Sequence, residues 1–433
     1  MMSQPSQVEA PPAAPRSRRK LIAATVAIIV ILVAIAGVTA YYLTQPKSFA
    51  GTIKVGFTIS ITGNFNVEGG NSLNGIKTAA NWINSHGGVT VQGKAYNISL
   101  DYYDDQSVQG NIQSLYTRVI QQDGAEFLLA PYSSPLTTAA APLADTYDRV
   151  MISHGGASDL IWTQNSRRNL VEALSPGSVY LRGAVDWLKA NHPGDKIAAL
   201  YASDSFSSLA TQSAIGYAQS LGFSVVYNAS YPSTANDLSP QLNAAKAAGA
   251  DDLIGGGHFQ DGQLIMTNLK TTWTPKFISL LVAVTEPTFQ TNLDATANNV
   301  TGPSQWESIV NYSPSLAQSL GVSWYGPTPA EFTQLYGTLN GGATPGYHAG
   351  EAGGALFVLA NAIEQANSLN TTDVRAKLGS MNIMTFFGRF QIDSRGLQTA
   401  HSMVLVQWQA GAKKVVFPSS VADATCQYPY TGA

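Results

Sequence analysis

The sequence predicts an α/β protein made of two similar units, each with a parallel sheet covered by helices on both faces. Strand-like and helix-like segments alternate along the chain, which is typical of parallel sheets. The same alternation restarts after Leu174-Ser175-Pro176-Gly177. At 433 residues, the chain is also longer than a single typical core requires. We therefore expect two lobes with a cleft between them.

The first unit combines β-branched strands with helices whose apolar residues recur at helical spacing. Its expected strands are 53–59, 96–103, 127–130 and 150–153. Its expected helices are 72–85, 111–122 and 136–147. Glycines 87 and 88 end the first of these helices, as glycine commonly does.

The second unit repeats this pattern. Its expected strands are 197–201, 224–227 and 252–255, and its expected helices are 180–190, 208–221 and 239–248. Further on we expect helices at 330–339 and 347–366 and a strand at 388–392, with additional elements at 277–284 and 369–378. Segments 403–409 and 413–417 flank Ala410-Gly411-Ala412, which predicts a terminal antiparallel hairpin.

Two strands of the first unit end in runs of small or hydroxyl-bearing residues. Pro131-Tyr132-Ser133-Ser134 follows strand 127–130, and His154-Gly155-Gly156-Ala157-Ser158 follows strand 150–153. Ligands of open parallel sheets bind beyond the carboxyl ends of the strands. Small residues let a ligand approach the backbone there, and a following helix offers free N–H groups. The alternative interpretation is that both runs are ordinary strand-to-helix turns.

The N-terminus predicts a membrane segment. Leu21–Leu43 contains no charged residue and is long enough to cross a bilayer of about 30 Å. Arg16, Arg18, Arg19 and Lys20 precede it, which places the N-terminal side in the cytoplasm and the rest outside. A cleaved secretory signal is the alternative, because Val38-Thr39-Ala40 resembles a cleavage site.

Composition and motifs argue against several classes of protein. The net charge of -3 gives no basic surface for nucleic acid, and the single Cys426 excludes an internal disulfide. The six histidines have no metal-ligand spacing, and the common nucleophile, phosphate-loop and zinc-protease motifs are missing. We therefore expect no metal, no cofactor and no enzymatic activity.

Segments spread over residues 52–420 resemble the extracytoplasmic solute-binding proteins of ABC importers, of the branched-chain amino acid and amide type. The similar segments include IKVGFTISITG (53–63), APYSSPLTTAAAP (130–142), MISHGGASDLI (151–161) and GGGHFQDG (255–262). Their order and spacing carry the resemblance. It implies the periplasmic binding protein type I fold, with two Rossmann-like lobes, a three-crossing hinge and capture of a ligand by lobe closure.

The resemblance also assigns candidate ligand-binding residues by position. In the first lobe these are Glu68, Tyr132, Ser133, Ser134, Gly155, Gly156, Ala157 and Ser158, and in the second lobe they are Phe206, His258 and Glu286. Branched-chain amino acid binders have an acid near the interlobe crossing, where this chain has Ser178. An amino acid ligand would then need Glu68 or Glu286 to pair with its ammonium group.

The expected organisation follows from these segments. It comprises a cytoplasmic tail (1–20), an anchor or signal (21–43), a linker (44–52), the first lobe (53–174, with 303–390 returning), the second lobe (175–302, with 391–420 returning) and a C-terminal tail (421–433). We expect a membrane-anchored receptor outside the cytoplasm that passes a small amino acid to an ABC importer permease. The alternatives are a binder of short amides or urea-like solutes, a sensory ectodomain, or an enzyme on the same fold.

Overall fold

The computed structural model describes residues 49–164 and 167–431. Residues Phe49–Ala433 form one compact unit. The expected cytoplasmic tail and the anchor or signal at 21–43 lie outside the described residues. Within 49–164 and 167–431, no helix is long and apolar enough to cross a membrane.

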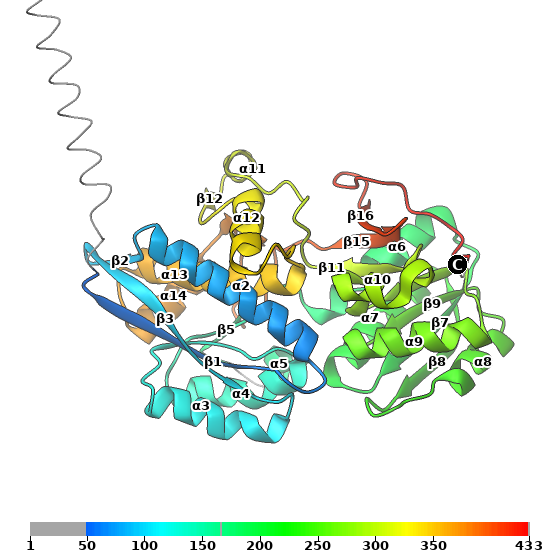
Figure 1. The fold of residues 1–433 in the computed structure, drawn as a ribbon, viewed down its shortest axis with the longest axis horizontal. Helices are drawn as coiled ribbons and strands as arrows, with labels where there is room; N and C mark the ends of the chain where they lie inside the picture. Colours follow the sequence, from blue (N-terminus) through cyan, green and yellow to red (C-terminus); the bar gives the residue numbers. More distant parts are fainter. Residues whose placement is uncertain (1–48, 165–166, 432–433) are drawn as a thin grey trace, which may run out of the picture. The chain divides into compact units, whose positions relative to one another are not determined.

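The first lobe is built on a six-stranded sheet in the order β2-β3-β1-β4-β5-β6 (Figure 1). Its strands are β1 (Gly51–Ile59), β2 (Val89–Val91), β3 (Lys94–Asp104), β4 (Phe127–Leu129), β5 (Met151–Ser153) and β6 (Leu170–Glu172). All pairs are parallel except β2 with β3, which form a hairpin across Gln92 and Gly93. The four strands expected here are confirmed, whereas β2 and β6, of three residues each, were not predicted.

Helices cover the first sheet, and α2 and α13 lie side by side (Figure 1). The helices of this lobe are α2 (Asn66–Ser85), η1 (Gln109–Asn111), α3 (Ile112–Gln121), α4 (Ser134–Thr146), α5 (Leu160–Thr163), α12 (Pro329–Leu339), α13 (Tyr347–Ala366) and α14 (Thr371–Ser380). A Cβ on Gly75 of α2 would lie 2.1 Å from the Ala349 carbonyl oxygen of α13. Glycine therefore permits the close approach of the two helices.

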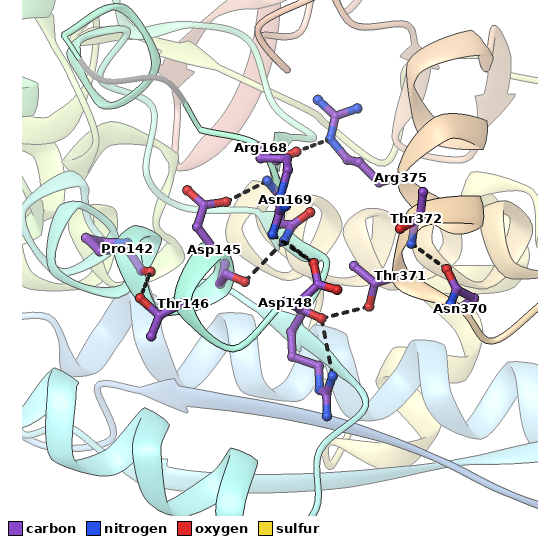
Figure 2. Close-up of polar contacts among 12 residues, drawn as sticks. Pro142, Asp145, Thr146, Asp148, Arg168, Asn169, Asn370, Thr371, Thr372 and Arg375 are labelled. Atoms are coloured by element: carbon purple, nitrogen blue, oxygen red, sulfur yellow. Dashed lines mark hydrogen bonds and ion pairs between the residues drawn. The ribbon is translucent and has the colours of Figure 1, made fainter.

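Polar contacts hold α14 to the first lobe (Figure 2). The Thr371 hydroxyl donates to the Asp148 carbonyl oxygen at 2.8 Å, and Arg375 Nε donates to the Arg168 carbonyl oxygen at 2.7 Å. Asn169 Nδ2 donates to the Asp148 carboxylate at 3.1 Å. A segment from late in the chain is thus joined to β6 and to the loop after α4.

The second lobe is built on a seven-stranded sheet in the order β16-β15-β11-β10-β9-β7-β8. Its strands are β7 (Lys196–Ala202), β8 (Ser224–Tyr231), β9 (Asp252–Gly256), β10 (Phe277–Leu280), β11 (Thr301–Ser304), β15 (Val404–Gln409) and β16 (Ala412–Phe417). The sheet is parallel from β8 to β11, and β15 and β16 add an antiparallel edge. The predicted antiparallel hairpin is confirmed, whereas the antiparallel strand β2 of the first sheet was not predicted.

The helices of the second lobe follow its strands. They are η2 (Gly177–Val179), α6 (Arg182–Asn191), α7 (Ser205–Ser220), α8 (Ser239–Ala247), α9 (Phe259–Thr272), η3 (Ala283–Thr285), α10 (Pro287–Leu293) and η4 (Asp294–Ala297). The segment expected at 277–284 contains two elements, β10 in its first half and the start of the 3₁₀ turn η3 at its end. Helices α9 and α10 were not predicted.

The chain passes between the lobes three times, after β6, after β11 and after β14. A small third sheet contains β12 (Ser323–Trp324), β13 (Ile383–Thr385) and β14 (Gly388–Phe390), and α11 (Pro314–Ser319) precedes it. One residue from each crossing joins a hydrogen-bonded group. The Gln305 side chain accepts from Ser175 N at 3.0 Å and donates to its carbonyl oxygen at 3.1 Å, and His401 Nε2 lies 2.8 Å from the Gln305 carbonyl oxygen.

Candidate functional site

The loops and helix starts that follow strands of the two sheets meet between the lobes. Glu68 lies in α2 after β1, and Tyr132 follows β4. From the other lobe, Phe206 follows β7, His258 follows β9 and Glu286 follows β10. All five side chains are buried. The carboxyl ends of the parallel strands, where α/β sheets bind ligands, therefore form the candidate site.

Glu68 contacts the second lobe directly. Its Oε1 atom accepts a hydrogen bond from the Phe259 backbone N–H at 2.9 Å. Phe259 is the first residue of α9, so the carboxylate lies at the positive end of that helix. Glu68 Oε2 is buried and makes no hydrogen bond to any residue that the structure describes. Burial raises the pKa of Glu68, because the charged form has lost its water.

Tyr132 and His258 form a second contact between the lobes. The Tyr132 hydroxyl and His258 Nδ1 are 3.0 Å apart. The ring centroids of Phe65 and His258 are 4.5 Å apart, and those of Phe206 and His258, both of the second lobe, are 5.7 Å apart. The predicted residues Tyr132, Phe206 and His258 are thus brought together in one aromatic group.

Glu286 is held by two side chains of the first lobe. Asn71 Nδ2 donates to its Oε2 atom at 2.6 Å, and His348 Nδ1 pairs with its Oε1 atom. Both carboxylate oxygens therefore already have partners in this arrangement. Glu286 serves here as a contact between the lobes rather than as a free acid.

The predicted serine loop connects the two lobes through hydroxyl groups. Ser134 Oγ accepts from Ser158 N at 2.9 Å, and the Ser158 hydroxyl donates to the Ser205 carbonyl oxygen of the second lobe at 3.3 Å. Ser133, which caps α4, has a φ of +81°. Such a conformation is strained in a residue other than glycine and is concentrated at functional sites.

Gly155, Gly156 and Ala157 pack tightly inside the first lobe. A Cβ on Gly155 would lie 2.7 Å from the Tyr132 ring, and one on Gly156 would lie 2.4 Å from Thr137 Oγ1. The Ala157 carbonyl oxygen accepts from Gly177 N at 2.6 Å. The two glycines are therefore required for packing within the first lobe. An ordinary strand-to-helix turn would require them for the same reason, so their presence does not by itself indicate a ligand.

Ser178 is not in this group. Its hydroxyl donates to Asp159 Oδ2 at 2.6 Å, and its backbone N–H donates to Asp159 Oδ1 at 3.2 Å. We expected Ser178 to replace the acid found near the crossing in branched-chain amino acid binders. The structure shows that Asp159 supplies an acid next to Ser178. This acid lies 19 residues earlier in the chain, and only the fold brings it to the crossing.

Sequence reasoning predicted helix α13 but missed three candidate site residues at its start. Tyr347, His348 and Glu351 are buried there, and the His348 ring lies 5.2 Å from the Tyr132 ring. We use "interlobe cluster" for Glu68, Tyr132, His258, Glu286, Tyr347, His348 and Glu351. The sequence did contain a signal for His348 and Glu351, because both are polar residues in the otherwise apolar stretch Tyr347–Ala360.

Of the three acids in the interlobe cluster, only Glu286 makes a hydrogen bond to another member of the cluster. In the part of the chain that the structure describes, no lysine or arginine is buried. Burial raises the pKa of Glu351 well above its usual range, and the nearby Glu286 adds to this. Burial lowers the pKa of His154, at the end of β5, to about 3. A carboxylate that is buried in this way needs a partner with polar or charged atoms.

Two cavities border the interlobe contact. One of about 290 Å³ is lined by Pro287 and Gly346, the neighbours of Glu286 and Tyr347. Another of about 290 Å³ is lined by Ser158 and Ser205. Among the described residues, no group of three or more His, Cys, Asp or Glu side chains could hold a metal ion.

Sequence comparison identifies the family of this chain. The family model described as "Periplasmic binding protein" matches residues 52–413. The Leu/Ile/Val-binding protein homolog 7 of Brucella abortus is 22% identical over 392 residues, covering 87% of this chain and 94% of that protein.

Solved structures show the same fold. The branched-chain amino acid transporter substrate-binding protein of Streptococcus pneumoniae, in complex with isoleucine, gives a TM-score of 0.71 at 20% identity and covers 85% of this chain and all (100%) of its own. An ABC transporter solute-binding protein of R. palustris, in complex with benzoate, gives a TM-score of 0.68 at 14% identity. The match covers 84% of this chain and 95% of that protein's chain. The chain therefore belongs to the periplasmic binding protein family, a family of extracytoplasmic solute-binding proteins of the type that serves branched-chain amino acid ABC transporters.

Proposed function

We propose that this protein captures a small amino acid between its two lobes and delivers it to an ABC importer. The observation that carries the proposal is Glu68 Oε2, a buried carboxylate oxygen between the lobes without a hydrogen-bond partner among the described residues. An ammonium group would supply the missing positive charge and donors. A charge-assisted bond of this kind is also stronger than a neutral one.

The N-terminal end of α4 supports binding of the solute's carboxylate. Ser133 and Ser134 lie at the start of this 13-residue helix, where backbone N–H groups and the helix dipole favour an anion. The hydroxyl of Ser158 lies in the neighbouring loop. Glu68 at one side and this helix start at the other offer opposite charges to the two ends of an amino acid.

Closure of the lobes would complete the site. Side-chain contacts of the first lobe already reach the second lobe, among them those of Glu68, Asn71, Tyr132, Ser158 and His348. A solute favours the closed state only through contacts that the open state lacks. Because Glu68 and His258 come from different lobes, a solute touching both would bind the closed form more tightly.

The N-terminal segment supports a site of action at the membrane. Residues 21–43 are uncharged and follow four basic residues, so we propose that they hold the binding unit on the outer surface. A permease would then receive the solute from the closed form. A cleaved signal would give the same binding unit without the anchor.

A melting panel with the full-length protein tests the proposal. A solute that binds only the folded state raises the melting temperature with its concentration. We expect amino acids to stabilise the protein and sugars to have no effect. Stabilisation by short amides, urea or benzoate but by no amino acid would overturn the amino acid assignment.

A further inference from the structure

Glu351 is a second buried acid in the interlobe cluster, and the amino acid site proposed above does not use it. Its side chain is 1% exposed, and its Oε2 atom makes no hydrogen bond to any residue of the described chain. Burying an unpaired carboxylate is costly. A structural role would ordinarily give both oxygens partners, as the protein does for Glu286.

Helix α13 directs Glu351 toward the contact between the lobes. Tyr347 and His348 stand four and three residues before it, so the three side chains share one face of the helix. His348 on this face pairs with Glu286 of the second lobe and packs its ring against Tyr132. Glu351 therefore belongs to the same interlobe surface as the residues that close the site.

Tyrosine rings lie near this acid, since Tyr347 stands one helical turn before it and the Tyr132 ring packs on His348 of the same helix face. Tyr132, Tyr180 and Tyr347 are all buried, and the ring centroids of Tyr180 and Phe206 are 5.0 Å apart. The pKa of each of the three tyrosines is raised, first by burial and in part by the charge of Glu351. Aromatic faces attract cations, and a carboxylate among them strengthens this preference.

From these contacts we propose that the solute carries a second cationic group, an ammonium or guanidinium, which binds at Glu351. The inference rests on the proposed amino acid site and refines it. Glu68 would receive the α-ammonium group and Glu351 the cation of the side chain. The solute class is then the basic amino acids rather than the aliphatic ones.

Titration calorimetry of the full-length protein with L-lysine and L-norleucine tests this assignment. The two solutes have side chains with the same carbon skeleton and differ by the terminal ammonium group. We expect lysine to bind at least tenfold more tightly than norleucine. Equal or tighter binding of norleucine would overturn the second cation site while leaving the amino acid site in place.

Two variants separate a binding role from a structural one. Glu351→Gln keeps the shape of the side chain but removes its charge, and we expect the advantage of lysine to fall below threefold. Glu364→Gln is the matched control on the same helix, since Glu364 is partly exposed and accepts from Thr90 N at 3.0 Å. An unchanged lysine advantage in Glu351→Gln would refute the assignment. Failure of lysine, norleucine and every other amino acid to bind would instead refute the proposed function itself.

Discussion

The Glu68 carboxylate of the first lobe accepts a hydrogen bond from the Phe259 backbone N–H of the second lobe at 2.9 Å. The two residues are 191 positions apart, so the bond exists only when the lobes are together. The same carboxylate has a second, buried oxygen without a hydrogen-bond partner among the described residues. The side chain that joins the lobes is therefore also the one that we propose to bind the solute.

Replacing Glu68 with Gln should weaken binding of an amino acid. The amide keeps an acceptor for Phe259 N–H but removes the charge that would pair with the ammonium group. We expect a loss of affinity of about 10- to 100-fold, the usual worth of a hydrogen bond to a charged group. Calorimetric titration of wild type and variant measures it, and equal affinities would remove Glu68 from the site.

Replacing Ser133 and Ser158 together with Ala should also weaken binding. The variant loses the Ser158 bond to the Ser205 carbonyl oxygen and the hydroxyl at the start of α4. We expect the binding free energy to fall by about 2–4 kcal/mol, because each buried hydrogen bond contributes roughly 1–2 kcal/mol. Ser114→Ala, at an exposed position of α3, is the control and should bind normally. Wild-type affinity in the double variant would show that the solute does not use these loops.

Two glycines of α2 should respond to alanine in opposite ways. At Gly75 the new Cβ would lie 2.1 Å from the Ala349 carbonyl oxygen, so α2 and α13 must separate. We expect Gly75→Ala to lose about 1–3 kcal/mol of unfolding free energy. Nothing lies within 4 Å of a Cβ at Gly70, so Gly70→Ala should gain about 0.5–1 kcal/mol from helix propensity.

Urea unfolding of both glycine variants gives the comparison. A similar effect of the two substitutions would show that the contact between α2 and α13 does not depend on Gly75.

Asp252 should make stability depend on pH. Burial, together with Asp195 and Asp251, raises its pKa to about 8 in the folded state. The folded protein then holds a proton that the unfolded chain releases near pH 4, so Asp252 lowers stability increasingly between about pH 4 and 8. Asp252→Asn should therefore raise the melting temperature at pH 8, and the gain should disappear near pH 4.

Asp251 should have the opposite effect on the pH dependence of the melting temperature. Its pKa is lowered, because contacts that include Lys276, 2.8 Å away, outweigh the effect of burial. Asp251→Asn should lower the melting temperature at neutral pH, and this loss should vanish in acid as the wild-type carboxylate also becomes protonated. A pH-independent effect of Asp252→Asn would contradict the proton held in the folded state.

Local patterns were sufficient to predict most of the architecture. The strands at 53–59 and 197–201 and the helix at 347–366 show clear periodicity, and β1, β7 and α13 confirm them. Short elements such as β2 and β6 were missed, since three residues carry no measurable period. Helix α9 was missed because its cap is His258, which pairs with Asp261 in a capping box that usually begins with Ser or Thr.

The candidate site was predicted less completely. Resemblance assigned Glu68, Tyr132 and His258, and the fold places these three together. Glu351 is a polar residue in an apolar stretch of sequence, but its burial became evident only from the structure, in which α13 is buried on all sides over its first 17 residues, Tyr347–Ile363. Asp159 pairs with Ser178 through tertiary contact alone, which no local pattern can predict.

Hydrogen–deuterium exchange of the full-length protein, with and without the amino acid that gives the largest thermal shift, tests capture between the lobes most directly. We expect slower exchange in both lobes at once, at the starts of α2 and α4 and at the start of α9, with α8 unchanged. Slower exchange confined to one lobe, or located at α8, would contradict capture between the lobes.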